Sequence, residues 1–369
     1  MKWRALITVV LLGLDFTGRS QFATNQPSEL PADRLPRTNL LVFHHQDGSV
    51  LPVKVKADWQ SRRAEILRGF EQIAGPLPGP EKRCALNVRV EERKDGGTYE
   101  QQLLTFASEP GSRVPAYLLV PKAAREAKGT ARAILCLHPT DMEYGHRVTV
   151  EPLRENYPPY AKELAERGFV TLAPAYPLMA NYQPDLKALG WRSGTLKAVW
   201  DNLRALDLLD SLPYVKAGNY GVIGHSLGGH NGIYTSIFDE RIKVVVSSCG
   251  FDSFADYYHG NPANWQPERG WCQTRYMPKL ADYRDRLEEI PFDFHELIGA
   301  LAPREVFINA PLNDNNFQAQ SVDAVVQSAA TVFELFQARK HLLVVHPPAP
   351  HAFPEAVREQ AYRILADNL

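Results

Sequence analysis

The sequence has little cysteine and no excess of charge of either sign. Only four of its 369 residues are cysteine (Cys84, Cys136, Cys249 and Cys272), and none are spaced as zinc ligands, which excludes a zinc-knuckle protein. Lys and Arg total 41 residues against 42 Asp and Glu, so the basic surface of a nucleic-acid-binding protein is not expected. A hydrophobic content of 44% with a net charge of −1 excludes a disordered chain. The sequence leaves open whether Cys84 and Cys272 pair in an oxidising compartment.

Outside the first residues, the sequence lacks any apolar run long enough to cross a membrane. Lys2 and Arg4 precede the apolar run 5–14, which is the pattern of a secretory signal peptide. The run is too short for a bilayer, which needs about 20 apolar residues. No clean Ala-x-Ala cleavage motif precedes Ala23. We expect residues 1–22 to be a signal peptide and the protein to be secreted or periplasmic, without an integral membrane span; the alternative is an apolar leader on a cytoplasmic protein.

Beyond this leader, the hydrophobic pattern predicts one α/β domain. Residues 23–54 are expected to form a linker or N-terminal extension, and residues 55–369 the domain itself. A helix is predicted over 58–73, with Asp58 as its N-cap. A hairpin signal at 95–97 and three strand-like segments then predict antiparallel pairing; the segments are 84–92, 99–107 and 114–120.

After residue 122, short apolar segments alternate with helical ones. This alternation is typical of a parallel sheet whose strands are buried on both faces by helices. We therefore expect an α/β fold with a mostly parallel central sheet, helices on both faces and antiparallel strands at its N-terminal side. The strands are predicted at 133–137, 169–172, 220–224, 242–247, 306–309 and 342–345, and the helices at 159–167 and 195–212.

The segment 250–302 interrupts this alternation and is predicted to be an inserted loop or lid. It is longer than a connection inside a compact domain needs, and such segments often cover binding sites. The rings of Trp265 and Trp271 could stack on the apolar face of a sugar, which makes them candidate substrate-binding residues. Packing of the segment onto the domain is the alternative role for these aromatic side chains.

The segment Gly224-His-Ser-Leu-Gly228 is the candidate catalytic motif. It has the form G-x-S-x-G between a predicted buried strand and a predicted helix, which is the context of a nucleophile elbow. Small residues two before and two after the serine allow the sharp turn that exposes its hydroxyl. Ser226 is therefore the candidate nucleophile, and we interpret His225 as structural.

A serine nucleophile needs a histidine base, and the base needs an orienting carboxylate. Elbow enzymes carry these in the chain order Ser, acid, His. His351 follows the predicted strand 342–345 and is the favoured base, with His346 as the rival. Asp314 follows the strand 306–309 and is the favoured acid, with Asp252, one strand earlier, as the rival.

The oxyanion of an acyl-transfer intermediate needs two backbone N–H donors. The residue after the nucleophile, Leu227, is expected to supply one. The second is expected from the loop after the strand 133–137, and because Pro139 has no N–H, Thr140 is the candidate.

Taken together, these motifs resemble the α/β-hydrolase superfamily. Within it the chain is similar to bacterial dienelactone-hydrolase-like and acetyl-xylan-esterase-like enzymes related to prolyl oligopeptidase. The resemblance covers about residues 55–369, and apart from Ser226, Asp314 and His351 it depends on the segments 135–140, 167–174, 200–207 and 223–229. Dienelactone hydrolases proper use a cysteine nucleophile, whereas the serine of this chain favours ordinary ester hydrolysis.

The resemblance implies a serine esterase that acts through an acyl-enzyme, with acyl esters of carbohydrate as candidate substrates. It implies no metal and no organic cofactor. Two other functions remain open at this point: a peptidase or amidase with the same residues, and a binding protein on the same scaffold.

Overall fold

The computed structural model describes residues 34–369, and the expected signal peptide lies outside them. A nine-stranded sheet forms the centre, in the order β11-β10-β9-β8-β6-β7-β5-β4-β3. The strands from β6 to β11 are parallel to one another, while β3, β4 and β5 pair antiparallel and β5 also joins β7 antiparallel, so the antiparallel strands lie at the N-terminal side as predicted. The bounds are β3 Arg89–Asp95, β4 Tyr99–Glu109, β5 Ser112–Pro121, β6 Ala131–Leu137, β7 Val170–Pro174, β8 Val215–His225, β9 Ile242–Ser248, β10 Glu305–Asn309 and β11 Leu342–Val345.

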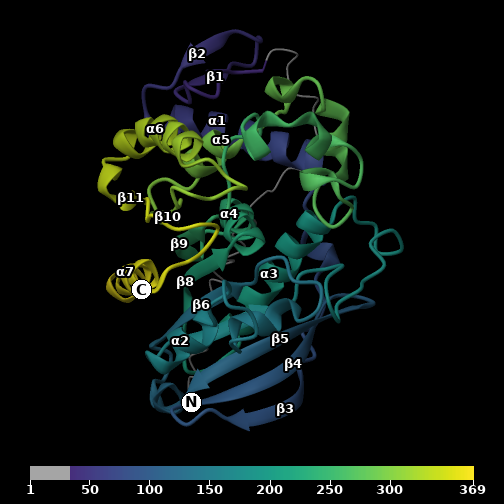
Figure 1. Cartoon of the computed structure of the whole chain (residues 1–369), viewed down its shortest axis with the longest axis vertical. Helices are drawn as coiled ribbons and strands as arrows, with labels where there is room; N and C mark the ends of the chain where they lie inside the picture. The colour runs from purple at the N-terminus through teal and green to yellow at the C-terminus, as the bar shows by residue number, and fades with distance from the viewer. Residues whose placement is uncertain (1–33) are drawn as a thin grey trace, which may run out of the picture.

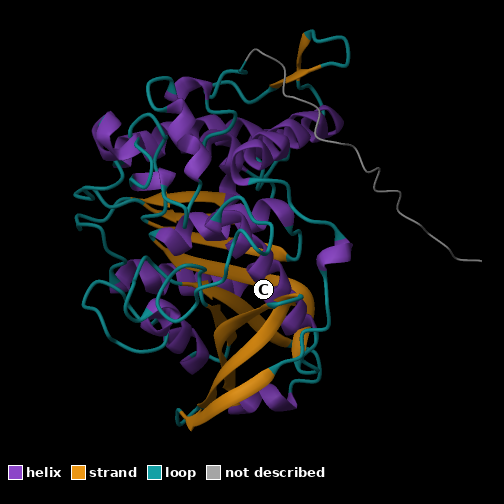
Figure 2. Cartoon of the chain, turned by 90° about the vertical axis from the view of Figure 1, so that its right-hand side faces the viewer, coloured by secondary structure: helices purple, strands orange, loops and turns teal. Residues whose placement is uncertain are grey.

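Helices cover both faces of this sheet, as Figure 2 shows. Side chains alternate along each strand, so Leu135 of β6 packs on one face and Ile134 on the other. The first face packs against α1 Lys56–Ala74, α3 Gly194–Asp210, α4 Leu227–Phe238, α5 Phe294–Gly299 and α6 Ala319–Leu335. The second packs against α2 Tyr160–Glu166 and α7 Glu355–Asn368. Short 3-10 helices lie at η1 Pro80–Lys82, η2 Lys122–Glu126, η3 Gly145–Thr149, η4 Tyr257–Gly260, η5 Pro262–Trp265, η6 Gly270–Cys272, η7 Pro278–Tyr283, η8 Leu287–Glu289 and η9 Arg339–His341.

The N-terminal extension carries a small hairpin at the opposite end of the molecule from β3 (Figure 1). It consists of β1 Val42–His44 and β2 Val50–Pro52, which pair antiparallel. Helix α1 starts at Lys56 and its N-cap is Val55, three residues before Asp58, the expected N-cap. Asp58 instead lies inside the first turn, where its carboxylate accepts the N–H groups of Lys54 and Val55. It therefore caps the helix from the third helical position.

The sequence pattern predicts the first strand of the central sheet at a position that differs from the observed one. The strand was predicted over 84–92, but β3 spans Arg89–Asp95 and all seven of its residues are exposed. An edge strand without a buried face has no reason to alternate apolar and polar residues, so the pattern was a poor guide here. The predicted turn is confirmed: Gly97 has a φ of 84° and donates its N–H to Asp95 at 2.9 Å.

The inserted segment 250–302 is a series of short 3-10 turns followed by α5. It is held to the N-terminal extension by buried ion pairs, in which Arg34 contacts Glu296 and Arg37 contacts Asp293 at 3.2 Å. Arg62 of α1 also reaches Glu296 at 3.2 Å. These contacts join the extension, α1 and the inserted segment.

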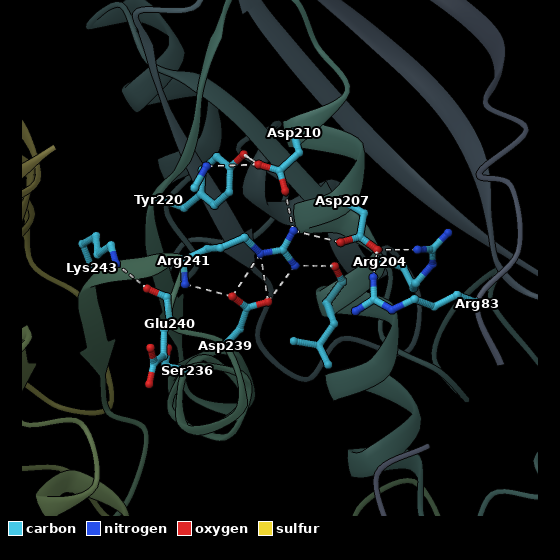
Figure 3. A network of polar contacts seen from close by, with 12 residues as sticks. Arg83, Arg204, Asp207, Asp210, Tyr220, Ser236, Asp239, Glu240, Arg241 and Lys243 are labelled. Atoms are coloured by element: carbon cyan, nitrogen blue, oxygen red, sulfur yellow. Dashed lines mark hydrogen bonds and ion pairs between the residues drawn. The ribbon is translucent and has the colours of Figure 1, made fainter. Parts of the chain in front are cut away.

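A second ion network, shown in Figure 3, connects α3 to the turn between α4 and β9. The guanidinium of Arg241 contacts Asp207 at 2.8 Å and Asp239 at 2.6 Å, and also pairs with Asp210. These carboxylates raise the pKa of Arg241 above its ordinary value, against the opposing effect of burial. Because it bonds to both α3 and the α4–β9 turn, this side chain fixes the distance between them.

All four cysteines are free, so Cys84 and Cys272 do not form the disulfide that the sequence left open. None of the helices within residues 34–369 is long and apolar enough to cross a membrane.

Candidate active site

Ser226 lies at a sharp turn between β8 and α4. The strand ends at His225 and the helix begins at Leu227, so Ser226 is the single residue between them. Its φ of 54° and ψ of −120° fall in a region that residues other than glycine rarely adopt. This is the backbone geometry of a nucleophile elbow, which exposes a serine hydroxyl at the edge of the sheet.

The glycines on either side of Ser226 are required by close backbone contacts. A Cβ on Gly224 would lie 2.2 Å from the carbonyl carbon of Gly228. A Cβ on Gly228 would lie 1.9 Å from the carbonyl oxygen of Leu137. The structure therefore agrees with the expectation that small residues are needed two before and two after the serine.

His351 and Asp314 form a hydrogen-bonded pair at the same edge of the sheet. Nδ1 of His351 donates to Oδ2 of Asp314 at 2.8 Å, and the Asp314 side chain is almost fully buried. The other carboxylate oxygen accepts the N–H groups of Asn316 at 2.8 Å and Phe317 at 3.2 Å. A carboxylate at Nδ1 fixes the tautomer in which Nε2 is unprotonated, so Nε2 can accept a proton.

His225 connects this pair to the elbow. It directly precedes Ser226, and its ring centroid lies 5.0 Å from that of His351. Its Nδ1 is 3.0 Å from Oγ of Ser248, and burial lowers its pKa well below the ordinary value. A neutral, anchored imidazole at this position agrees with the structural role expected for His225.

The two rival residues have other partners. Both ring nitrogens of His346 are bonded, to the carbonyl of Ala310 at 2.7 Å and to Asp323 at 2.9 Å. Asp252 accepts the N–H of Gln318 at 3.1 Å, and burial raises its pKa to about 8. The structure thus brings Asp314 rather than Asp252 to His351, and it engages His346 elsewhere.

A cleft of about 610 Å³ opens beside the pair, and its lining includes both His351 and Thr140. The hydroxyl of Thr140 lies 2.9 Å from that of Tyr276. His138, two residues earlier, bonds the carbonyl of Pro139 through Nδ1 at 2.7 Å and accepts the N–H of Tyr176 at Nε2 at 2.9 Å. Burial lowers the pKa of His138 to about 4, so this neutral ring holds the loop that carries the expected oxyanion donor.

The other expected oxyanion donor, Leu227, is the first residue of α4. The backbone N–H groups in the first turn of a helix have no partner within the helix, and they favour negative charge. Leu227 and Thr140 thus come from two segments that meet at the carboxyl end of β6 and β8.

Trp265 and Trp271 do not line the cleft beside His351. Trp265 is fully buried and packs edge-on against Phe254, with ring centroids 5.7 Å apart. Trp271 is 4% exposed and lies 4.6 Å from the ring of His230. The burial of both rings favours the alternative role in packing, because a ring enclosed by other side chains has no free face for a sugar.

Two side chains that contact the backbone next to His351, those of Asn309 and Cys249, could not be identified from the sequence. Asn309 donates to the carbonyl of Ala352 at 3.0 Å, and the thiol of Cys249 lies 3.3 Å from the same oxygen. The sulfur of Cys249 is also within 4.8 Å of ligand atoms of both Asp314 and His351. The one sequence signal was an asparagine at the end of the apolar strand 306–309, which nothing local distinguished from a turn residue.

Comparison with known proteins gives one family and several relatives. The family described as "Glucuronyl esterase, fungi" matches residues 190–337, which include Ser226 and Asp314. The protein YtaP of Bacillus subtilis, whose name describes it as a hydrolase, is 25% identical to this chain over 313 residues. The match covers 82% of this chain and 98% of YtaP.

Solved structures of esterases share the fold. A glucuronoyl esterase from Solibacter usitatus superposes with a TM-score of 0.68 at 20% identity, covering 92% of this chain and 99% of the other. An acetyl xylan esterase from Paenibacillus sp. R4 superposes with a TM-score of 0.53 at 16% identity, covering 78% and 90%. With the sheet order and the helices on both faces, these similarities show that the chain has the α/β-hydrolase fold.

Proposed function

We propose that the chain hydrolyses carboxylic esters through Ser226, His351 and Asp314, by way of an acyl-enzyme. Nε2 of His351 accepts the proton of Ser226 as the serine oxygen attacks the ester carbonyl, and then passes it to the leaving alcohol. Asp314 holds the ring and stabilises the imidazolium that forms. The N–H groups of Leu227 and Thr140 bind the developing oxyanion. Water then repeats the sequence and releases the acid.

One observation carries this proposal. His351, which bonds Asp314 at 2.8 Å, lines the cleft, and His225, the residue before Ser226, packs its ring against that of His351. A binding protein on this scaffold would have no need of a strained serine, a fixed imidazole tautomer and a buried carboxylate at one edge.

The cleft also supports a polar, sugar-like substrate. Its lining includes the carboxamides of Asn156, Asn315 and Asn316 and the hydroxyl of Tyr157, which can donate and accept hydrogen bonds. Together with the matching glucuronyl esterase family, this lining supports an ester of a sugar, with esters of a uronic acid as the first candidates.

The charges of the cleft agree with such a neutral ester. Three carboxyl groups line it, on Asp141, Glu143 and Glu155, against the single guanidinium of Arg154. Arg154 is already paired with Asp141 and Glu143, each at 2.8 Å. An esterified uronic acid has no charge at the reacting carboxyl, whereas the released acid is an anion. A net negative cleft therefore favours substrate over product.

The test is a substrate panel with purified protein. Methyl and benzyl esters of glucuronic acid, acetylated xylan, 4-nitrophenyl acetate and 4-nitroacetanilide are compared in the wild-type chain and in Ser226→Ala. We expect turnover of esters, with the uronic acid esters preferred, and a loss of about 10⁶-fold in kcat in the variant. Anilide turnover equal to ester turnover would favour an amidase. No turnover of any ester would contradict the proposal.

We also propose export of the protein, from Lys2, Arg4 and the apolar run 5–14. The N-terminal mass of protein recovered from a periplasmic or culture-fluid fraction tests it. Loss of about 20 residues is expected, and an intact Met1 on protein confined to the cytoplasmic fraction would contradict it.

A further inference from the structure

The side chain of Asn309 joins the two halves of the candidate active site. Asn309 is the last residue of β10, and its Nδ2 donates to the carbonyl of Ala352 at 3.0 Å and to Oγ of Ser248 at 2.8 Å. Ala352 directly follows His351, and the carbonyl of Ser248 accepts the N–H of Ser226 at 2.8 Å. We infer that Asn309 is a positioning residue that holds His351 in register with Ser226, an inference that rests on the ester hydrolysis proposed above.

Both donors of the Asn309 amide are used by these two bonds. A primary amide has two N–H groups, and this one is only 1% exposed, so water cannot easily replace either partner. The carbonyl of Ala352 has a second contact, with the thiol of Cys249 at 3.3 Å, but a thiol is a weak donor. Asn309 therefore supplies the strong hydrogen bond to the backbone beside His351.

The bond to Ser248 extends the connection to the elbow. Oγ of Ser248 lies 3.0 Å from Nδ1 of His225, whose ring lies 5.0 Å from that of His351. The titratable groups around the amide are thus His225, Cys249 and the His351–Asp314 pair. Cys249 contacts the same two groups, Oγ of Ser248 at 3.8 Å and the carbonyl of Ala352, but only through its sulfur. Asn309 therefore supplies the stronger hydrogen bonds between the end of β9 and the backbone beside His351.

Asp314 alone fixes one nitrogen of the His351 ring but not the backbone that carries it. Loss of the Asn309 amide would let residues 351–352 shift while the Asp314 bond persists. A misplacement of about 1 Å at a reacting group costs about 10²-fold in rate. We expect kcat to fall about 10- to 100-fold, with KM nearly unchanged because the cleft that binds substrate keeps its lining.

The test compares Asn309→Asp and Asn309→Ala with the wild-type chain. Asparagine and aspartate have nearly the same shape, but a carboxylate cannot donate, and a protonated carboxyl donates once. The kcat of Asn309→Asp, relative to that of the wild type at the same pH, should therefore fall further as the pH rises from 5 to 8. Reaction with a fluorophosphonate, which needs Ser226 and His351 but little binding, should slow to the same extent.

Asn202→Asp is the matched control. The Asn202 amide is also buried and also uses its donors, on Asn231 at 2.6 Å and Thr235 at 2.9 Å between α3 and α4. This variant should lose thermal stability but keep the wild-type kcat and pH profile.

Asn309 variants that keep kcat within twofold, or that lose kcat only as much as Asn202→Asp does at the same Tm, would overturn the inference. A wild-type chain that neither turns over esters nor reacts with the probe would instead overturn the proposed function, and the inference with it.

Discussion

Among single residues, Asp314 and Asp252 are the two candidates for the acid of the site, and they differ in what they bond. Asp314 bonds Nδ1 of His351, whereas Asp252 bonds the backbone of Gln318. Asp314→Asn should therefore lower kcat by about 10⁴-fold, because the amide favours the wrong tautomer of the imidazole. Asp252→Asn should stay within about threefold of the wild type, since the amide oxygen can still accept the Gln318 N–H. Steady-state kinetics on one ester check both, and an inactive Asp252 variant with an active Asp314 variant would reverse the assignment.

The same Asp252 should make stability depend on pH. Burial, with the nearby carboxyls of Asp256 and Asp293, raises its folded pKa to about 8 from an ordinary value of 3.8. Between these pH values the folded state holds a proton that the unfolded state has lost, so this group makes the protein less stable as pH rises from about 4 to about 8. The Tm of Asp252→Asn should therefore rise relative to that of the wild type as the pH increases across this range. A constant difference in Tm between pH 5 and pH 8 would show that the carboxyl is not protonated in the folded protein.

Candidate site residues could be predicted from the sequence where the pattern around them is local. Ser226 could be predicted because its glycine neighbours, strand and helix all lie within a few positions of it. His351 and Asp314 followed from the strands that precede them. Asn309 could not be predicted, since its partners Ser248 and Ala352 are 61 and 43 positions away and a strand-end asparagine looks like any turn residue.

At the scale of elements, the inserted segment 250–302 is held together by its aromatic side chains. Trp265 is fully buried against Phe254 and Tyr257. Trp265→Ala should cost about 3–5 kcal/mol of unfolding free energy, as large aromatic truncations in cores do. Below the lowered Tm, kcat/KM should change by the same factor for a benzyl glucuronate and for 4-nitrophenyl acetate. A selective rise in KM for the bulky ester, without loss of stability, would return Trp265 to the substrate site.

Elements buried on both faces were predictable, and exposed ones were not. The parallel strands β6 to β10 appear in the sequence as continuous apolar runs because helices cover both of their faces. The edge strand β3 has no such signature, and its start was misplaced by five residues. The hairpin β1–β2 was not foreseen either, since its two strands have only three residues each.

At the scale of the whole molecule, the N-terminal extension is part of the folded unit. Arg34 and Arg37 neutralise Glu296 and Asp293, which are almost fully buried. A chain that lacks residues 1–54 leaves these carboxylates with fewer partners, and removing one member of a buried ion pair costs about 3–5 kcal/mol. We expect this chain to melt well below one that lacks only residues 1–33. Equal melting temperatures by calorimetry would show that residues 34–54 contribute nothing to stability.

The most direct test of the proposed nucleophile is to identify the residue that a fluorophosphonate phosphonylates. Wild-type protein is treated with a fluorophosphonate, digested and mapped by mass spectrometry, alongside Ser226→Ala, Asp314→Asn and Asn309→Ala. We expect one stoichiometric adduct on Ser226 in the wild type, none in Ser226→Ala, and slower labelling of the same residue in the other two variants. An adduct on any other residue, or no adduct on the folded wild-type chain, would contradict this assignment.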